Sequence, residues 1–326
     1  MLILGIDSSC DDTSASIVED GTTILSNIVS NQAEIHKKYG GIVPELASRR
    51  HTEMIWPVVD EALTVAGVRL EGISAIAVCH GPGLIGSLLV GISFAKAMAY
   101  SSGIPIVAVN HLEAHIFSSF LEEPRPKFPF LALIVSGGHT SLYKVAAFGS
   151  YEELGRTRDD AVGEAYDKVA KLLGLGYPGG PIIDRLAEKG NAEAINFPRP
   201  YLHGSHDFSF SGLKTAVLLY LREHPDVPVE DVAAGFQTAV VDVLVKKTIE
   251  AAKANGLSRI VLSGGVSANR HLRHRIMGAD RDIEVFLPSP FLCTDNAAMV
   301  ASAGYYHFLD NHIASLKLNP EAYLPL

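Results

Sequence analysis

Two histidines spaced four residues apart are the side chains in this sequence best suited to hold a metal ion. His111 and His115 stand in the segment NHLEAH, which follows an apolar run and leads into a helical stretch. Side chains at i and i+4 lie on one face of a helix, so two imidazoles at this spacing can share one metal. A third ligand is needed, and Asp295 in CTDNAAM, ahead of an expected helix, is the best candidate. Two histidines and one carboxylate with open positions favour Fe²⁺, with Zn²⁺ second.

The same spacing also suits two ordinary histidines on the surface or in the core of a helix. It does not suit a zinc peptidase of the HExxH type, because Glu113 follows His111 by two residues and points elsewhere on the helix. The residues alone therefore leave a metal site and two ordinary histidines open, and they count against a metallopeptidase.

Glycine-rich turns follow several of the apolar runs. They are HGPG at residues 80–83, SGGH at 136–139, YPGGP at 177–181 and SGGV at 263–266. Glycine lets backbone N–H groups approach phosphate oxygens, and a helix N-terminus after the turn adds a partial positive charge. No lysine stands at P-loop spacing, so the turns predict a nucleotide site that is neither P-loop nor Rossmann. Asn269, shortly after the last turn, is suited to hold a nucleoside.

Carboxylates gather at two turns, the first expected hairpin and the glycine-rich turn YPGGP. Asp7, Asp11 and Asp12 flank the first expected hairpin, while Asp167 and Asp184 bracket YPGGP. Asp11 and Asp12 also fit plain turn residues, and Asp167 also fits a solvated helix face paired with Lys171 at i+4.

Strands and helices alternate almost throughout, which predicts an α/β fold with largely parallel sheets covered on both faces. The strand-like runs are LILGID, AIAVCH, IVAVN, FLALIVS, RIVLSGG and IEVFLP. The best internal break is EEPRPKFP, at residues 122–129, where charges and prolines end a helix. The segment from Gly5 aligns without gaps to the segment from Ala132, 127 residues later, which indicates a duplicated strand–turn–strand.

Composition narrows the class of protein further. The 326 residues have 48% hydrophobic positions and a formal net charge of −9, which excludes a disordered chain and a uniformly basic nucleic-acid binder. Three cysteines stand singly with no CxxC pair, which fits a reducing cytoplasm. The N-terminus lacks a signal-peptide pattern, and the apolar stretch 84–100 is short and carries Lys96, so we expect a buried helix and no membrane span.

The motifs together resemble one known family, the tRNA N6-adenosine threonylcarbamoyltransferases, which were once called O-sialoglycoprotein endopeptidases. The resemblance covers essentially the whole chain and is to the bacterial and organellar branch. The segments that carry it are GIDSSCDDTSASI, KYGGIVPELASRRH, HGPGLIGSLLVG, NHLEAH, VSGGHTSL, YPGGP, FSFSGLKTA and SGGVSANRHLR. Two departures are visible: Ala114 stands where many members have glycine, and Asp7 stands where many have glutamate.

The resemblance implies the two-lobed, duplicated fold of the acetate kinase, sugar kinase, Hsp70 and actin group. We expect an N-terminal lobe of residues 1–110 plus about 295–326, a C-terminal lobe of residues 111–294, and an active cleft between them. The implied reaction transfers a threonylcarbamoyl group from threonylcarbamoyl-adenylate to N6 of the adenosine 3′-adjacent to the anticodon. The tRNAs concerned read codons that start with A.

Position by position, the resemblance also implies roles for residues. His111, His115 and Asp295 fall on ligands of one Fe²⁺, with Zn²⁺ possible in its place, and Asp11 falls on a carboxylate implicated in catalysis. The positions that match substrate contacts are Ile134, Val135, Ser136, Gly137, Gly138, Asp167, Gly180, Asp184 and Asn269.

Two other functions remain open beside this one. A small-molecule kinase of the same fold group leaves the metal triad unexplained, and a non-catalytic scaffold paralogue has no use for that triad. A chain of net charge −9 also repels tRNA unless basic residues are concentrated locally. The local basic clusters are Lys37–Lys38, Arg49–Arg50 with His51, and the run 270–275. The resemblance implies that a paralogous scaffold subunit and a small ATPase subunit are also needed.

Overall fold

A computed structural model of the chain describes residues 1–202 and 204–326. The described residues form two compact units: unit 1 is Met1–Arg125 with Thr294–Leu326, and unit 2 is Pro126–Cys293. The first boundary falls inside the expected break at 122–129 and not at residue 110. The stretch after 110 stays with unit 1 because Phe117 packs against Tyr306, their ring centroids 5.1 Å apart, within that unit.

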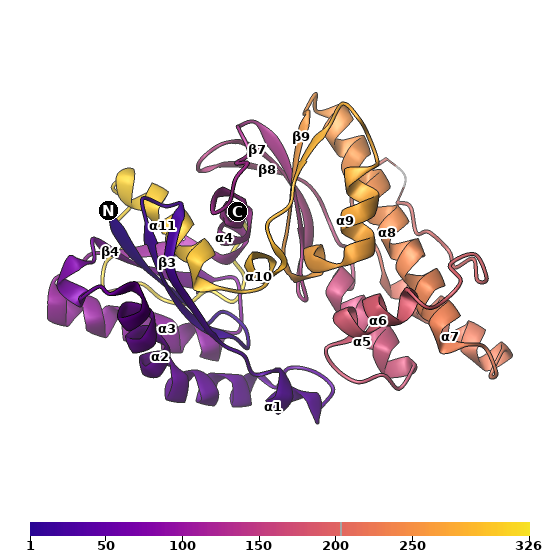
Figure 1. The fold of residues 1–326 in the computed structure, drawn as a ribbon, viewed down its shortest axis with the longest axis horizontal. Helices are drawn as coiled ribbons and strands as arrows, with labels where there is room; N and C mark the ends of the chain where they lie inside the picture. Colours follow the sequence, from indigo (N-terminus) through magenta and orange to yellow (C-terminus); the bar gives the residue numbers. More distant parts are fainter. Residues whose placement is uncertain (203) are drawn as a thin grey trace. The chain divides into compact units, whose positions relative to one another are not determined.

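Unit 1 is built on a five-stranded sheet in the order β3-β2-β1-β4-β5 (Figure 1). Strands β1, β4 and β5 are parallel, whereas β2 and β3 are antiparallel to their neighbours. The strands are β1 (Leu2–Asp7), β2 (Thr13–Glu19), β3 (Thr23–Ser30), β4 (Ala75–Gly81) and β5 (Ile106–Asn110). Five helices accompany them: α1 (Ala33–Lys37), α2 (Pro44–Ala66), α3 (Ile85–Ser102), α4 (His111–Phe117) and α11 (Ala297–Leu309).

Helices cover both faces of this sheet, as the alternating side chains of β1 require. A Cβ on Gly5 would meet the backbone of α11, 2.8 Å from the Ala301 nitrogen, so α11 lies directly against that face. The next residue, Ile6, points the other way and reaches Gly91 of α3. Helices therefore cover the sheet on both sides, and β1 is buried along most of its length.

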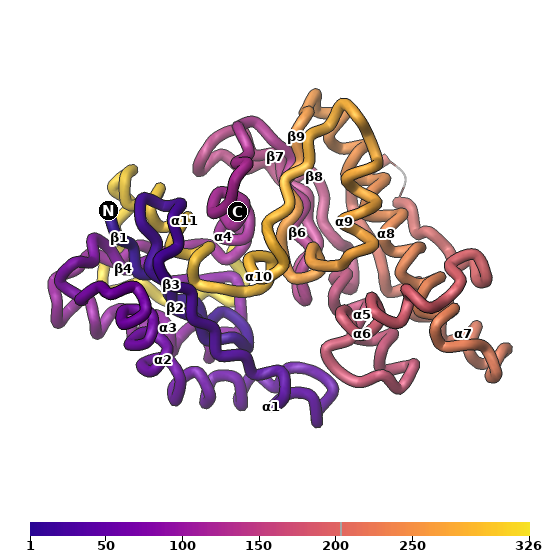
Figure 2. Tube along the Cα trace, viewed as in Figure 1, coloured from indigo at the N-terminus to yellow at the C-terminus, as the bar shows by residue number. Residues whose placement is uncertain are grey.

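Unit 2 repeats the pattern with a sheet in the order β10-β9-β6-β7-β8 (Figure 2). Its strands are β6 (Phe130–Val135), β7 (Thr140–Ala147), β8 (Ser150–Arg156), β9 (Arg259–Ser263) and β10 (Glu284–Phe286). Its helices are α5 (Val162–Leu172), α6 (Gly179–Ala187), α7 (Ser211–Glu223), α8 (Val229–Ala254), α9 (Arg270–Met277) and α10 (Pro290–Cys293). The helical spacing of six apolar residues predicts one buried stripe on α8, and all six are buried: Val232, Phe236, Ala239, Val240, Val243 and Leu244. Gly256, beyond the end of this helix, has a φ of +63°.

The two sheets confirm the predicted duplication residue by residue. In unit 1, Asp7 pairs with Ser14 across β1 and β2, and in unit 2 Ile134 pairs with Ser141 across β6 and β7. Both pairs differ by the same 127 positions that the sequence alignment gave. The third strand of each unit is again antiparallel and the remaining two are parallel.

One described helix, α3, is long and apolar enough to cross a membrane by length and composition alone. It packs against α2 and β4 and buries Leu88, Ile92 and Ala95. However, 33% of the window is buried, so the expected buried helix is only partly covered, and Ile85, Leu89 and Tyr100 stay exposed.

Candidate functional site

The two predicted histidines lie at the carboxyl edge of the parallel strands of unit 1. Strand β5 ends at Asn110, whose side-chain oxygen accepts hydrogen bonds from the backbone N–H of Leu112 at 2.8 Å and of Glu113 at 3.4 Å. An asparagine at this position caps a helix, so α4 begins at His111. Its first turn then places the His111 and His115 rings edge to face, 4.7 Å apart between centroids.

The structure brings Asp295 to the same two rings. Oδ1 of Asp295 lies 3.6 Å from Nε2 of His111 and 3.3 Å from Nε2 of His115. Asp295 comes just before α11, whose first turn is capped by the Asn296 side chain. Three ligand atoms from two separate segments therefore lie within 4.8 Å of one another.

The triad fits a divalent transition metal by its chemistry and its burial. Among the described residues, Nε2 of His115, the ring nitrogen that points toward Asp295, is buried and has no hydrogen-bond partner. Burial lowers the pKa of His115, which keeps its imidazole neutral, as a metal ligand must be. The Asp295 side chain stays 24% exposed, so one side of the triad is open to a substrate. Two nitrogens and one carboxylate oxygen suit Fe²⁺ or Zn²⁺.

The turn between β1 and β2 carries the acidic residues predicted beside the site. Burial, followed by repulsion from Asp295, raises the pKa of Asp11. Burial, then the neighbouring Asp11 and Asp295, raises the pKa of Asp12 to about 8. Oδ1 of Asp12 also accepts a hydrogen bond from the Asn31 side chain at 2.7 Å. The turn thus holds two carboxyl groups that bind protons more readily than free aspartate.

A histidine without a predicted role holds this turn in place. Nε2 of His51 lies 2.9 Å from the Cys10 carbonyl, and Nδ1 lies 2.7 Å from Oγ1 of Thr13. A carbonyl can only accept, so Nε2 donates and Nδ1 accepts from the threonine hydroxyl. Burial lowers the pKa of His51, consistent with this neutral form. His51 closes the segment KYGGIVPELASRRH, and the sequence pointed to it only there and as a member of the basic cluster with Arg49 and Arg50. Its buried, neutral ring adds no positive charge to that cluster.

In unit 2 the predicted substrate positions begin at the turn after β6. Ile134 and Val135 are buried strand residues, while Gly137 and Gly138 follow in the turn, and a Cβ on either glycine would meet no atom within 4 Å. The Ser136 N–H donates to the His139 carbonyl at 2.8 Å and closes the turn. Helix α5 packs so tightly here that a Cβ on Gly163 would lie 2.6 Å from the Ser136 carbonyl oxygen.

The remaining substrate positions link neighbouring helices of unit 2. Asp167 accepts a hydrogen bond from the Gly179 N–H at 2.6 Å, so it joins α5 to the start of α6 next to Gly180. This contact replaces the alternative i+4 pairing with Lys171. Asp184 of α6 accepts from the Arg270 side chain at 3.0 Å. Adjacent Asn269 caps α9 and donates to Gln237 at 2.7 Å. The sequence analysis did not identify Gly163, which packs against the turn after β6, or Gln237, which accepts the Asn269 hydrogen bond.

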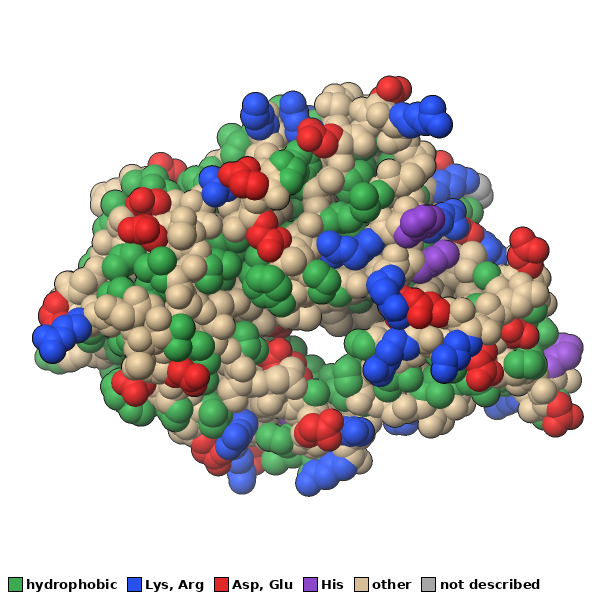
Figure 3. Space-filling view, in the orientation of Figure 1, with side chains coloured by type: hydrophobic (Ala, Val, Ile, Leu, Met, Phe, Trp, Pro, Cys, Tyr) green, Lys and Arg blue, Asp and Glu red, His purple; other side chains and the backbone are tan. Residues whose placement is uncertain are grey.

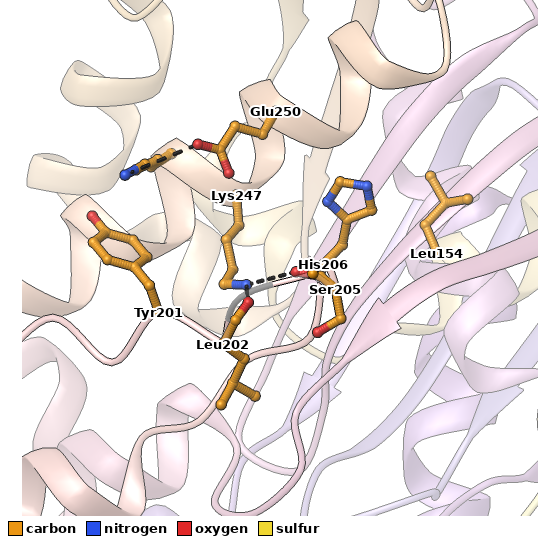
Figure 4. Close-up of a pocket in the computed structure, with 9 residues that line it drawn as sticks. Leu154, Tyr201, Leu202, Ser205, His206, Lys247 and Glu250 are labelled. Atoms are coloured by element: carbon orange, nitrogen blue, oxygen red, sulfur yellow. Dashed lines mark hydrogen bonds and ion pairs between the residues drawn. The ribbon is translucent and has the colours of Figure 1, made fainter.

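A separate cavity of about 550 Å³ lies elsewhere in unit 2 (Figure 4). It contains none of the predicted site residues. Its buried lysine, Lys247, donates to the carbonyls of Leu202 at 3.0 Å and Ser205 at 2.9 Å, and burial lowers the pKa of Lys247. These bonds tie the preceding loop to α8, which gives Lys247 a structural role.

The local basic clusters are largely neutralised within the chain. In the run 270–275, Arg270 pairs with Asp184 and Glu188, and Arg275 pairs with Asp242. Arg49 and Arg50 pair with glutamates of their own helix, α2. Figure 3 likewise shows acidic side chains beside many of the basic ones on the face drawn. The predicted basic clusters therefore offer less free positive charge than the sequence indicates.

Solved structures with a similar fold define the class first. HypF from T. kodakarensis matches with a TM-score of 0.65 and 15% identity, over 95% of this chain and 48% of that one. Component A of (R)-2-hydroxyglutaryl-CoA dehydratase from Acidaminococcus fermentans matches with a TM-score of 0.55 and 16% identity, over 94% and 98%. The fold is that of the acetate kinase, sugar kinase, Hsp70 and actin group, as expected.

Sequence relatives then define the family. The family model for tRNA N6-adenosine threonylcarbamoyltransferase matches residues 23–302. A protein of that name from Thermodesulfovibrio yellowstonii is 61% identical over 100% of both chains, and one from Clostridioides difficile is 53% identical over 98% of this chain and 96% of its own. The chain belongs to the tRNA N6-adenosine threonylcarbamoyltransferase family.

Proposed function

We propose that this enzyme transfers the threonylcarbamoyl group of threonylcarbamoyl-adenylate to N6 of the adenosine 3′-adjacent to the anticodon, in tRNAs that read codons starting with A. One observation carries the proposal: His111, His115 and Asp295 converge from separate segments in a chain that matches a threonylcarbamoyltransferase over its whole length. A scaffold paralogue would have no use for that convergence, and a small-molecule kinase would leave it unexplained.

The reaction is an acyl transfer from a donor that is already activated. The N6 amine attacks the carbamoyl carbon, the bond from that carbon to the phosphate oxygen breaks, AMP leaves, and N6 gives up one proton. The adenine amine is a weak nucleophile, so positioning and oxyanion stabilisation supply most of the rate. Asp11 accepts the N6 proton or orients the base, and burial raises its pKa, which makes it a stronger base than free aspartate.

The donor is held by unit 2. The open backbone of Gly137 and Gly138 leaves room for phosphate oxygens next to N–H groups. Asp167, Gly180, Asp184 and Asn269 line the connected helices on which the adenylate rests, with Ile134, Val135 and Ser136 forming the strand end below it.

The triad holds one Fe²⁺, and Zn²⁺ fits the same ligands. When bound, the metal supplies a Lewis acid and a template for the donor's phosphate or carbamoyl oxygens. The three cysteines form no disulfide among the described residues, and we place the enzyme in the cytoplasm on that basis.

Productive tRNA binding needs a heteromer with a paralogous scaffold subunit and a small ATPase. The chain has a net charge of −9, and its basic clusters are largely paired internally. Helices α2 and α3 pack together in unit 1 and leave large apolar side chains exposed, among them Trp56 at 58%, Leu89 at 52% and Tyr100 at 81%. This surface suits the paralogue, which then contributes area for the tRNA.

The direct test of the activity is a reconstitution. The chain, with and without the partner subunits, is incubated with tRNA, ATP, threonine, bicarbonate and an adenylate-forming enzyme, and digested nucleosides are analysed by mass spectrometry. Threonylcarbamoyladenosine is expected with the wild-type chain and not with His115→Ala. Equal product from both chains, or none from the complete mixture, would refute the proposal.

The heteromer is tested by filter binding of tRNA against salt concentration, for the chain alone and with the paralogue added. The complex is expected to bind more tightly and with a steeper salt dependence, because it neutralises more phosphates. Equal affinity and equal salt slope for chain and complex would show that the chain needs no partner to bind tRNA.

A further inference from the structure

Two buried polar atoms face each other beside the triad. Asp7 ends β1 with 1% of its surface exposed, and its Oδ1 accepts a hydrogen bond from the Ser9 N–H at 2.9 Å. Its other oxygen, Oδ2, has no hydrogen-bond partner among the described residues, and neither has Nδ1 of His111. These two atoms are 3.7 Å apart. A buried polar atom without a hydrogen-bond partner lowers the stability of the fold. The two atoms therefore indicate a hydrogen bond that forms when the metal binds.

The orientation of the His111 ring decides which ring nitrogen binds the metal and which carries the proton. Nε2 of His111 and Nε2 of His115 both point to Oδ1 of Asp295, so Nε2 is the nitrogen that faces the metal position. A neutral imidazole that uses Nε2 as a ligand carries its proton on Nδ1. For His111 that proton points toward Oδ2 of Asp7. A carboxylate that accepts the distal N–H of a metal-bound histidine fixes its tautomer and ring orientation.

A competing arrangement uses some of the same atoms. Asp7, Cys79 and His111 also have ligand atoms within 4.8 Å of one another, so these three residues could hold the metal themselves. All three are buried, whereas the triad has the partly exposed Asp295 on one side. A metal that receives a substrate needs an open coordination position, which the buried trio does not offer.

We propose that Asp7 is a positioning residue for the metal centre: its Oδ2 accepts the Nδ1–H of His111 and holds Nε2 toward the metal. The inference rests on the metal triad of the proposed function. In this role Asp7 neither binds the metal directly nor contacts the adenosine of the tRNA. It also gives His111 a carboxylate partner that no described residue provides at Nδ1 of His115.

The test is a metal titration of the metal-free, full-length protein. Co²⁺ binding is followed by its visible absorption, with elemental analysis for stoichiometry, in wild type, Asp7→Asn, Asp7→Glu, Cys79→Ser and His115→Ala. Asp7→Asn is expected to weaken the metal dissociation constant by about 10–100-fold while one metal still binds. Asp7→Glu keeps a carboxylate and is expected to retain the wild-type constant. Circular dichroism shows which variants fold. If Asp7→Asn does not fold, Asp7→Glu still tests the proposal, because a folded Asp7→Glu variant with a weakened metal constant would contradict it.

A second readout reports the hydrogen bond itself. In the Zn²⁺-loaded protein the His111 Nδ1 proton is expected as a slowly exchanging, downfield NMR signal. In Asp7→Asn that signal is expected to move upfield and to exchange faster, because a neutral amide oxygen accepts a weaker hydrogen bond than a carboxylate. An unchanged metal constant in Asp7→Asn, or an unchanged signal, would overturn the proposal. A sulfur-to-cobalt charge-transfer band that is lost in Cys79→Ser would also overturn it, because Asp7 would then belong to a ligand set with Cys79. Loss of metal from wild type itself would instead overturn the proposed metal centre.

Discussion

The two copies of the opening hairpin share a backbone register but differ in the side chains of their turns. Strands β1 and β2 pair with an offset of 127 residues from β6 and β7. The turn of unit 1 carries Asp11 and Asp12, both with raised pKa values, and it lies next to Asp295. The turn of unit 2 has Gly137 and Gly138 in the equivalent stretch and leaves open space above them.

The difference shows how one supersecondary unit serves two chemistries. Carboxyl groups in the first turn suit proton transfer and the neighbourhood of a metal. In the second turn a Cβ on Gly137 or Gly138 would meet no atom within 4 Å, which leaves room for a phosphate beside the backbone. Duplication thus supplies a common backbone register, and the side chains of the two turns differ within it.

The largest effect is expected when a histidine is removed from unit 1, which tests whether the metal binds in this unit. His115→Ala deletes one of two nitrogen ligands, so we expect complete loss of bound metal by elemental analysis, with the fold retained by circular dichroism. His111→Ala is expected to do the same. Exposed His224 in unit 2 provides a matched control, and His224→Ala should keep full metal occupancy. Full occupancy in His115→Ala would contradict the assignment.

Removing the acidic residue of the first turn is expected to act on turnover alone. Asp11→Ala should lower the rate of threonylcarbamoyl transfer by roughly 100-fold or more, the usual contribution of a general base. Metal and adenylate binding should stay near the wild-type values, measured by titration on the same preparation. The exposed Asp60 of α2 gives the control Asp60→Ala. Wild-type turnover in Asp11→Ala would mean that Asp11 is only a turn residue.

The second turn is tested through the glycine that packs beneath it. A Cβ on Gly163 would lie 2.6 Å from the Ser136 carbonyl oxygen and 2.8 Å from Cα of Gly137, both backbone atoms. Gly163→Ala should therefore shift the turn, weaken AMP binding and lower the free energy of unfolding by about 1–3 kcal/mol in urea titrations.

Gly212 of α7 is the matched control for this change, since a Cβ there meets no atom within 4 Å. Gly212→Ala should leave AMP binding unchanged and stability unchanged or raised, because alanine restricts the unfolded chain. Equal stability of the two alanine variants would show that Gly163 is not closely packed against the turn at residues 136–139.

The smallest expected effect is a pH dependence of stability. The pKa of Asp12 is about 8 in the folded chain, whereas free aspartate has about 3.9. Between these values the folded state binds more protons, so the free energy of unfolding falls as pH rises and levels off above pH 8. The groups that face Asp12 include the carboxyls Asp11, Asp295 and Asp7, which all raise its pKa, and the Asn31 amide.

Asp12→Asn removes this titration in the metal-free protein. The stability of Asp12→Asn relative to wild type should therefore increase from pH 5 to pH 8 in urea unfolding, while Asp60→Asn should keep the wild-type slope. A wild-type slope in Asp12→Asn would show that the carboxyl at position 12 does not titrate in this range.

Local sequence patterns predicted the parts of the fold and site that depend on local physics. The buried strands, the stripe of α8 and the i, i+4 histidines all follow from spacing along one element. Contacts between distant segments were not predictable in this way. Helix α4 belongs to unit 1 because Phe117 packs against Tyr306. Arg270 forms an ion pair with Asp184, which lies 86 residues earlier in the chain. Tertiary packing decides both contacts.

The most direct test of the division between the units is AMP binding measured by calorimetry on metal-free protein. If unit 2 holds the nucleotide and unit 1 the metal, wild type and His115→Ala should both show saturable AMP binding. Gly138→Val should show none, since the added side chain would occupy the open space above the turn, where a Cβ meets no atom within 4 Å. AMP binding that is lost in His115→Ala, or kept in Gly138→Val, would contradict the account.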